Sequence, residues 1–350
     1  MNAKELPRRR PLTVEDLPDG VQIAQGTGGK LTHQLIETLF VPQFDNPHLK
    51  ALGDQAILDP STERMALSTD AFVVKPYIFP GGNIGDLAVN GTVNDLLMGG
   101  ATPAYLTASF ILEEGLPTKN LVFIVESMAA AARKAGVQIV AGDTKVVERG
   151  AADGLYITTA GVGFVPNGIH WSPAKIRAGD VVIASGTIGD HGASVLAHRF
   201  EIDFESQIQS DTASLRDVVT AVRALPGIRC MRDPTRGGLA TTVQELSQAS
   251  GLNLRIRETA IPIREDVRGI CEVLGLDPLY LANEGKLVAV VAPEDAQQCL
   301  RIMRTVQEAR DASIVGVVTN DISGFASLET YIGAVRVLDL LSLDQLPRIC

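Results

Sequence analysis

The chain has 350 residues, 45% of them hydrophobic, and this length exceeds what one hydrophobic core normally organises, so two domains are expected. Lys and Arg total 31 against 41 Asp and Glu, and the resulting charge of −10 argues against nucleic acid and anionic membranes as partners. No signal peptide or membrane span is expected, and four cysteines without CxxC spacing favour reduced thiols in the cytosol over a disulfide framework or a zinc site.

A glycine loop near the start, residues 25–30, is followed by apolar residues at helical spacing up to Leu39. Such a loop presents free backbone N–H groups and a positive helix end, which favour an anion such as phosphate. Its spacing is not that of a Walker A loop or a dinucleotide fingerprint. Gly28 and Gly29 are therefore candidate phosphate contacts, and a flexible glycine turn is an equally good explanation.

Two short strands are predicted next, at 55–58 and 65–69, with a turn signal between them. If they pair about the centre of that turn, Asp54 lies opposite Asp70. Opposed like charges are unfavourable unless a cation lies between them, and Mg²⁺ suits a site of few carboxylates plus substrate phosphates. The alternative is that one aspartate only caps the turn.

The segment 84–98 predicts a mostly buried helix that ends at a pair of glycines. Its polar residues recur every four positions at Asp86, Asn90 and Asn94, with Asp95 beside them. A polar stripe on an apolar helix must face water or serve a site. We expect Asn94 and Asp95 to serve the site, and Asp86 and Asn90 to face solvent.

A strand at 104–112 and a helix from an N-cap at Thr118 to Gly136 lead to a strand at 137–141. A further strand at 155–165 closes the first half of the chain. The pattern of strands and helices predicts an α/β domain over residues 1–165.

The tetrad Gly142-Asp143-Thr144-Lys145 is predicted at the end of a strand, where α/β sheets commonly place ligands. A surface β-turn would explain its first three residues as well. Lys145 enters an apolar stretch, so burial there would lower its pKa toward that of a useful base.

Residues 166–178 are predicted to connect the domains, because Pro, Asn and Gly cluster there. The second domain, 179–325, alternates strand and helix. Strands are predicted at 181–185, 252–256, 287–292 and 313–319, and helices at 193–200, 212–225, 238–249, 266–274 and 293–309. After Ala326 no helical periodicity returns, so 326–350 is predicted to be a mobile tail.

Three polar residues of the second half are candidates for chemistry. Asp233 lies in a glycine-containing loop that opens a helix. Glu284 precedes the apolar strand at 287–292, where partial burial would raise its pKa, although a turn carboxylate paired with Lys286 is the alternative. His191 is a possible acid or base, but a lone loop histidine is more often structural.

The last residues, 345–350, end in Cys350. A terminal cysteine can be threaded head-first into a cleft, Pro347 stiffens the approach and Ile349 supplies an apolar contact. The alternative is a frayed chain end whose cysteine has no role.

Several of these segments together resemble a known family. They are 79–83, Asn94-Asp95, 142–147, the Asp-His-Gly loop at 190–192, 232–238, 283–287 and the terminal 347–350. Together they resemble the HypE family, the carbamoyl dehydratases of [NiFe]-hydrogenase maturation, from Gly26 to Cys350. More broadly the chain is similar to the superfamily of aminoimidazole ribonucleotide synthetase, selenophosphate synthetase and thiamine-monophosphate kinase.

The resemblance implies an α/β (α+β), two-domain PurM-like architecture. In this fold the N-terminal mixed sheet forms a homodimer and a C-terminal α+β domain precedes a Cys-terminated tail. It implies ATP bound with Mg²⁺ by dispersed aspartates, which map onto Asp54, Asp70, Asp95 and Asp233. The nucleotide site would also include the glycine loop, Asn94, Asp143 and Thr144. Gln25 stands where the family usually has a histidine, so no role is assigned to it.

The resemblance also implies a reaction. HypF would deliver a carbamoyl group to the Cys350 sulfur, ATP would phosphorylate its oxygen, and loss of phosphate with two N–H protons would leave a thiocyanate for the HypC–HypD complex. Lys145 and Glu284 would handle the protons.

Two alternatives remain open. Another ATP-dependent member of the superfamily would act on a free small molecule and would not need the tail. A non-catalytic scaffold would carry a vestigial ATP site.

Overall fold

The computed structural model describes residues 13–27, 30–50, 55–56, 58, 61–202, 208–321 and 323–340. A four-stranded sheet organises the N-terminal half in the order β1 (Arg64–Phe72), β6 (Leu155–Val165), β4 (Thr102–Glu113) and β5 (Gln138–Val147). β4 and β5 are parallel, joined by helix α5 (Thr118–Ala135), and the other pairs are antiparallel. Apolar residues alternate along these strands, so the sheet has one buried face.

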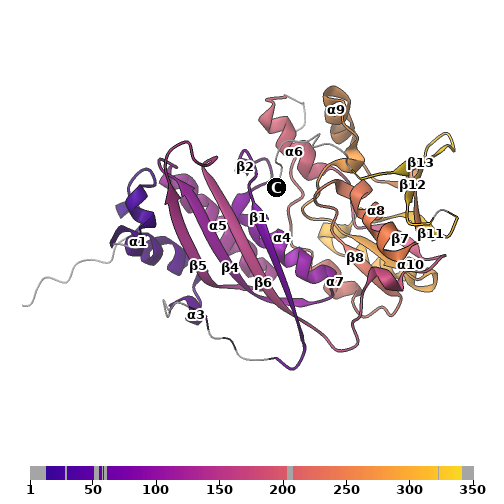
Figure 1. The fold of residues 1–350 in the computed structure, drawn as a ribbon, viewed down its shortest axis with the longest axis horizontal. Helices are drawn as coiled ribbons and strands as arrows, with labels where there is room; N and C mark the ends of the chain where they lie inside the picture. The colour runs from indigo at the N-terminus through magenta and orange to yellow at the C-terminus, as the bar shows by residue number, and fades with distance from the viewer. Residues whose placement is uncertain are drawn as a thin grey trace, which may run out of the picture.

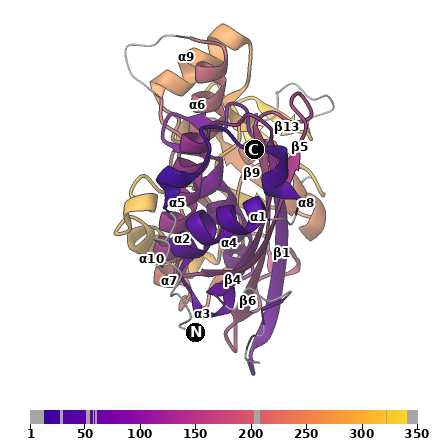
Figure 2. The ribbon, with the colours of Figure 1, turned by 90° about the vertical axis from the view of Figure 1, so that its left-hand side faces the viewer.

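Helices α4 (Ile84–Met98) and α5 lie on the same side of this sheet, as Figures 1 and 2 show. The face away from them carries exposed apolar side chains: Met65 is 68% exposed, Leu67 71% and Ile111 40%. A sheet with one solvated face normally carries polar residues there. These exposed side chains therefore mark a surface suited to a partner.

Short helices precede the sheet and pack near β5 and α5 (Figure 2). They are η1 (Val14–Asp16), η2 (Ile23–Gly26), α1 (Lys30–Leu35), η3 (Ile36–Phe40), α2 (Val41–Phe44) and α3 (Pro47–Lys50). The predicted helix after the glycine loop is thus present and begins at Lys30 in the described residues.

The predicted hairpin at 55–69 is wrong for the part of it that the structure describes. Gln55, Ala56 and Leu58 are not in a strand, whereas β1 pairs with β6 and sets Asp70 opposite Thr159. The turn signal does mark a strand boundary, because β1 begins directly after it. The pairing partner of β1 is β6, some ninety residues later in the chain, and local sequence gives no signal of this pairing.

The C-terminal half forms a seven-stranded mixed sheet beside the first domain (Figure 1). Its order is β13 (Val335–Leu338), β12 (Ala326–Glu329), β9 (Asn253–Arg257), β11 (Ser313–Thr319), β7 (Val181–Ala184), β10 (Val288–Val291) and β8 (Ile228–Arg232). The helices are α6 (Asp190–Arg199), α7 (Arg216–Val222), α8 (Gly238–Ser250), α9 (Glu265–Leu274) and α10 (Pro293–Met303). Short 3₁₀ turns lie at Pro173–Lys175, Glu258–Ala260, Pro278–Tyr280 and Gln307–Ala309.

The prediction that the tail begins at Ala326 is wrong. β12 pairs in parallel with β9 and in antiparallel with β13, and Ala326, Ser327 and Leu328 are buried. These strands are short and non-local, so no periodicity identified them. Residues 341–350 of the predicted tail lie outside the described residues.

Helix α4 begins with a capping box that follows the hairpin of β2 (Ile78–Phe79) and β3 (Gly82–Asn83). The Asn83 side chain accepts the Gly85 N–H, and the Asp86 carboxylate accepts the Asn83 N–H at 3.1 Å. Burial raises the pKa of Asp86 to about 6. Asp86 was expected to face solvent, but its side chain is only partly exposed.

Replacing Asp86 by asparagine is expected to stabilise the protein at pH 8. Because the pKa is raised in the folded state, the native carboxyl holds its proton where the unfolded one has lost it, so stability falls as pH rises from about 4 to 6. Asp86→Asn keeps an acceptor for Asn83 and removes that loss, worth about 1–3 kcal/mol. Thermal unfolding of both proteins should coincide near pH 4 and diverge above pH 6. A less stable variant at pH 8 would show that the charge instead stabilises the helix N-terminus.

Among the described residues, no helix is both long and apolar enough to cross a membrane.

Candidate active site

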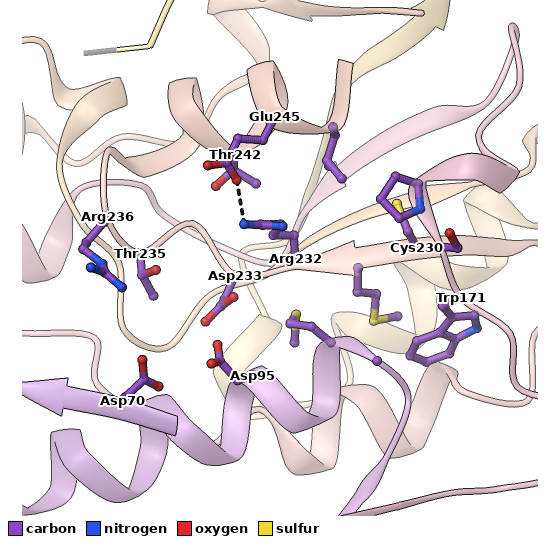
Figure 3. Close-up of a pocket in the computed structure, with 16 residues that line it drawn as sticks. Asp70, Asp95, Trp171, Cys230, Arg232, Asp233, Thr235, Arg236, Thr242 and Glu245 are labelled. Atoms are coloured by element: carbon purple, nitrogen blue, oxygen red, sulfur yellow. Dashed lines mark ion pairs between the residues drawn. The ribbon is translucent and has the colours of Figure 1, made fainter. Parts of the chain in front are cut away.

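A cavity of about 560 Å³ lies where the two domains meet. β1 and α4 of the first domain line one side, β8 and α8 of the second line the other, and Trp171 of the connecting segment closes one end (Figure 3). At the opposite end three carboxylates, from Asp70, Asp95 and Asp233, point toward one another.

Asp70 and Asp95 form the part of this cluster that belongs to the first domain. Burial, then the neighbouring Asp95 charge, raises the pKa of Asp70 to about 6. Ser68 donates a hydrogen bond of 2.6 Å to Asp95, and Thr92 donates one of 3.4 Å to Asp70. The two carboxylates were predicted to serve one site, and the structure brings them together.

Asp233 completes the cluster from the second domain. Asp233 follows directly after β8, and its side chain points toward Asp95 of α4 (Figure 3). Burial, then the Asp95 carboxylate, raises its pKa to about 7. Arg236 lines the same cavity and its positive charge lowers the pKa of Asp70, although less than burial and Asp95 raise it.

Glu284 is almost fully buried, with 3% of its surface exposed. Burial raises its pKa well above the usual value, and the charges of Asp211, Asp233, Asp70 and Asp95 raise it further. The preceding Asn283 donates its side-chain N–H to the Pro234 carbonyl at 3.0 Å, which ties this segment to the loop that carries Asp233. The predicted burial and raised pKa of Glu284 are confirmed.

The alternative prediction, in which Lys286 pairs with Glu284, is wrong. The Lys286 ammonium group lies 3.1 Å from the Asp211 carboxylate, and both side chains are largely buried. No role was predicted for Asp211 from the sequence. A helix was predicted over 212–225, but that helix begins only at Arg216, and the residues before it form the loop that carries Asp211.

The carboxylate cluster suits a hard divalent cation shared with a ligand. In the described part of the chain, no three His, Cys, Asp or Glu side chains lie close enough to enclose a metal ion by themselves. Burial and neighbouring carboxylates raise the pKa values of both Asp70 and Asp233, so a cation placed among these side chains would offset unfavourable negative charge. A cation that takes few carboxylates and completes its shell with phosphate oxygens and waters fits this donor set.

Asn90 and Asn94 both point from α4 into the second domain. Asn90 is 6% exposed and donates to the Thr212 hydroxyl at 3.3 Å, so its predicted exposure to solvent is wrong. Asn94 is 2% exposed and bonds main-chain groups of Ala213, Leu215 and Glu284. Its assignment to the nucleotide stays a prediction.

The Gly-Asp-Thr-Lys tetrad is not at a strand end, because β5 continues through it to Val147. Asp143 and Lys145 lie on the uncovered face of the sheet, with side chains 63% and 64% exposed and an ion pair of 3.2 Å. The expected burial of Lys145 is therefore not found in the single chain. β5 and β1 are opposite edges of the sheet, so the tetrad lies away from Asp70.

Thr144 points the other way and is 7% exposed. It lines a second cavity of about 330 Å³ between β5 and the N-terminal helices, together with aromatic residues Phe40, Phe44 and Phe110. Asp143 and Lys145 also contribute to the lining of this cavity.

Four predicted site residues, Gly28, Gly29, Asp54 and Cys350, lie outside the described residues. The other three cysteines, Cys230, Cys271 and Cys299, are free and buried. Burial raises the pKa of each to about 12, so these thiols are protonated near neutral pH.

Two residues that were left without a role have structural contacts. Gln25 is 2% exposed, and its side-chain oxygen accepts the Gln22 N–H at 2.9 Å. His191 is fully buried, with its Nδ1 2.8 Å from the Ser210 hydroxyl and its ring edge-on to Phe79. These contacts favour the structural role of His191.

Comparison with known proteins gives two domain matches and close full-length relatives. The AIR synthase related protein N-terminal domain matches residues 52–165, and the corresponding C-terminal domain matches 177–328. Carbamoyl dehydratase HypE of Azotobacter vinelandii is 51% identical over 96% of this chain and 99% of its own length.

Solved structures agree with these matches. A structure of the hydrogenase maturation protein HypE in complex with ATP has a TM-score of 0.90 and 46% identity over 94% of this chain and 99% of that one. A HypE–HypF complex matches with a TM-score of 0.77 and 45% identity over 89% of this chain and all of that one. This chain therefore belongs to the HypE family of AIR synthase related proteins.

Proposed function

We propose that this protein is an ATP-dependent carbamoyl dehydratase that converts a carbamoyl group on the Cys350 sulfur into a thiocyanate, the source of cyanide ligands for [NiFe] hydrogenases. The observation that carries the proposal is the likeness to carbamoyl dehydratase HypE over almost the whole chain, together with the ATP complex of a HypE protein. The cavity between the domains supports it, because carboxylates of both domains meet there.

Asp70, Asp95 and Asp233 are proposed to hold the phosphate end of ATP, with Asp54 as a further ligand of the cation. These carboxylates would hold Mg²⁺, whose positive charge would offset that of the transferring phosphoryl group. The glycine loop and the 142–145 tetrad are proposed to complete the nucleotide site. Because the tetrad lies at the opposite sheet edge from Asp70, it would join this site from the second copy of the proposed homodimer.

The reaction needs a phosphoryl transfer followed by an elimination. The carbamoyl oxygen takes the γ-phosphoryl group of ATP, since an amide oxygen leaves poorly until it carries phosphate. Two N–H protons and the phosphate are then lost, which gives a C≡N group on sulfur together with ADP and phosphate. Glu284 is proposed to accept a proton, because its raised pKa brings the carboxylate closer to the basicity that proton removal needs.

Cys350 fits the carrier role better than any described cysteine. The three described thiols are buried and protonated near neutrality, so they are poor nucleophiles. Residues 341–350 follow the last described residue, and ten residues reach at most about 33 Å when extended. The tether keeps the reacting group at a high local concentration.

Lys145 is proposed to act in a homodimer rather than within one chain. It lies on the uncovered sheet face with Met65, Leu67 and Ile111, where a second copy would bury it. A partner at this face would supply the desolvation that a catalytic lysine requires.

Replacing Leu67 by aspartate is expected to weaken the homodimer, because the new charge would be buried at the proposed interface. Sedimentation or light scattering should show at least a tenfold rise in monomer at equal concentration. Phe123→Asp is the matched control, since Phe123 is 47% exposed on α5 away from this face. Equal effects of both changes would contradict the interface.

HypF is proposed as the carbamoyl donor, since a relative with 45% identity has been solved with HypF. The HypC–HypD complex as cyanide acceptor and a cytosolic location stay predictions.

ATP hydrolysis measured with and without carbamoylation of Cys350 tests the proposal. Hydrolysis that depends on the carbamoyl group supports it. Hydrolysis driven by a free small molecule on a Cys350-less protein would favour another superfamily activity. No hydrolysis under either condition would favour a scaffold.

A further inference from the structure

Side chains form hydrogen bonds with both the N–H and the carbonyl group of Glu284. The Asp211 carboxylate accepts the Glu284 N–H at 3.0 Å, and the Asn94 amide donates to the Glu284 carbonyl at 3.3 Å. A backbone held at both its donor and its acceptor has little freedom to shift, so the root of the Glu284 side chain is fixed.

Asn94 also forms hydrogen bonds with the loop that carries Asp211. Its amide also donates to the Ala213 carbonyl at 3.0 Å, and its oxygen accepts the Leu215 N–H at 2.9 Å. The bonds to Glu284 and Leu215 are buried, where a lost hydrogen bond is costly. One side chain of the first domain thus joins two segments of the second.

The two segments are packed too closely to slide past each other. A Cβ atom at Gly285 would lie 1.9 Å from the Asp211 carbonyl oxygen, so only glycine fits there. The Lys286 ammonium also binds the Asp211 carboxylate at 3.1 Å. Residues 211–215 and 284–286 therefore form one unit, which we name the Glu284 clamp.

Asn94 is the link between this clamp and the carboxylate cluster. It is adjacent in α4 to Asp95, whose side chain lines the cavity. Any shift of α4 that moves Asp95 must also break or carry the hydrogen bonds of Asn94. The helix thereby sets the distance between the carboxylate cluster and Glu284.

We propose that Asn94 is a positioning residue that fixes Glu284 relative to Asp95 across the domain boundary through its hydrogen bonds to the Glu284 clamp. This inference rests on the proposed function, in which Glu284 takes a proton from the carbamoyl nitrogen. It gives Asn94 a role through Glu284 and not through contact with ATP.

The test is a double-mutant cycle on the carbamoylated full-length protein. Single-turnover formation of thiocyanate is measured for wild type, Asn94→Ala, Glu284→Gln and the double variant. Asn94→Ala is expected to slow the wild type about 10–100-fold, because misplacement by about 1 Å costs on that order. In the Glu284→Gln background the same change should cost less than about twofold, since the group that it positions is gone.

Equal slowing by Asn94→Ala in both backgrounds would overturn the inference, because Asn94 would then act through the nucleotide or the fold. A wild-type rate for Asn94→Ala would overturn it as well. Glu284→Gln alone reports on the proposed function: if its rate is that of wild type, the proton role of Glu284 fails, and this is distinguished from a failure of Asn94 positioning alone.

Asn90→Ala is the matched control. Asn90 lies one turn earlier on α4 and also bonds the Glu284 clamp, through the Thr212 hydroxyl, but among the described residues it makes no hydrogen bond to Glu284 itself. Its rate should stay within about twofold of wild type. If Asn94→Ala does not fold, Asn94→Asp replaces it: this variant keeps the acceptor for Leu215 and loses both donors, and the same non-additivity with Glu284→Gln is expected.

Discussion

Glu284→Gln is expected to lower the rate of thiocyanate formation by about 10²–10⁴-fold, the usual contribution of a general base, while ATP still binds. The amide is almost the same size and keeps the packing of this buried position, but it cannot accept the proton. Rapid-quench measurement of the C-terminal peptide, with nucleotide affinity measured separately, distinguishes loss of chemistry from loss of binding.

The pH dependence adds a second readout. Burial and four neighbouring carboxylates raise the pKa of Glu284, so its base form appears only as pH rises through that raised value. The wild-type rate should therefore climb with pH above the range of an ordinary glutamate, and the Glu284→Gln protein should lack this limb. Glu308→Gln is the control, because Lys134 pairs with Glu308 at 2.8 Å and that glutamate lies outside the carboxylate cluster. A pH profile and rate unchanged by Glu284→Gln would contradict the assignment.

Asp233→Asn is expected to have opposite effects on activity and on stability. Removing a carboxylate that would hold a divalent cation costs several kcal/mol at the transition state, about a hundredfold or more in turnover. The Mg²⁺ concentration for half-maximal ATP turnover should rise.

Without ligands, the same variant should unfold at a higher temperature than wild type at pH 8. Burial and Asp95 raise the pKa of Asp233 to about 7, so ionising it in the folded protein costs stability between about pH 4 and pH 7. Asp277→Asn serves as control, because Asp277 pairs with Arg336 of β13, and β13 and β8 are opposite edges of the second sheet. Full turnover with unchanged Mg²⁺ dependence in Asp233→Asn would exclude Asp233 from the site.

Elements with strong patterns were predictable from the sequence. α4, β6 and β11 lie at the residues predicted, because each combines a clear apolar pattern with a glycine, proline or polar boundary. β12 and β13 were missed because four residues carry little periodicity, and because β12, which joins β13 to the sheet, pairs with β9 some seventy residues earlier in the chain.

The candidate site likewise contains residues that local sequence signals indicated and residues that they did not. Asp95, Asp233 and Glu284 were candidates because of local signals, namely a polar stripe on a helix, a glycine-containing loop and a carboxylate before an apolar strand. Asp70 was a candidate through the resemblance and through a hairpin pairing that the structure does not have. Asp211 and the role of Asn94 were not predicted, because their partners are main-chain groups up to 190 residues away. Lys145 was expected to be buried, but the sequence of one chain does not say which sheet face is covered.

Mass spectrometry of the C-terminal peptide after incubation with HypF, carbamoyl phosphate and ATP tests the central claim most directly. The account predicts that Cys350 gains one carbamoyl group and that the peptide then loses one water only when ATP is present. A Cys350 peptide that stays unmodified while HypF is active, or equal cyanide delivery by a protein lacking Cys350, would contradict it.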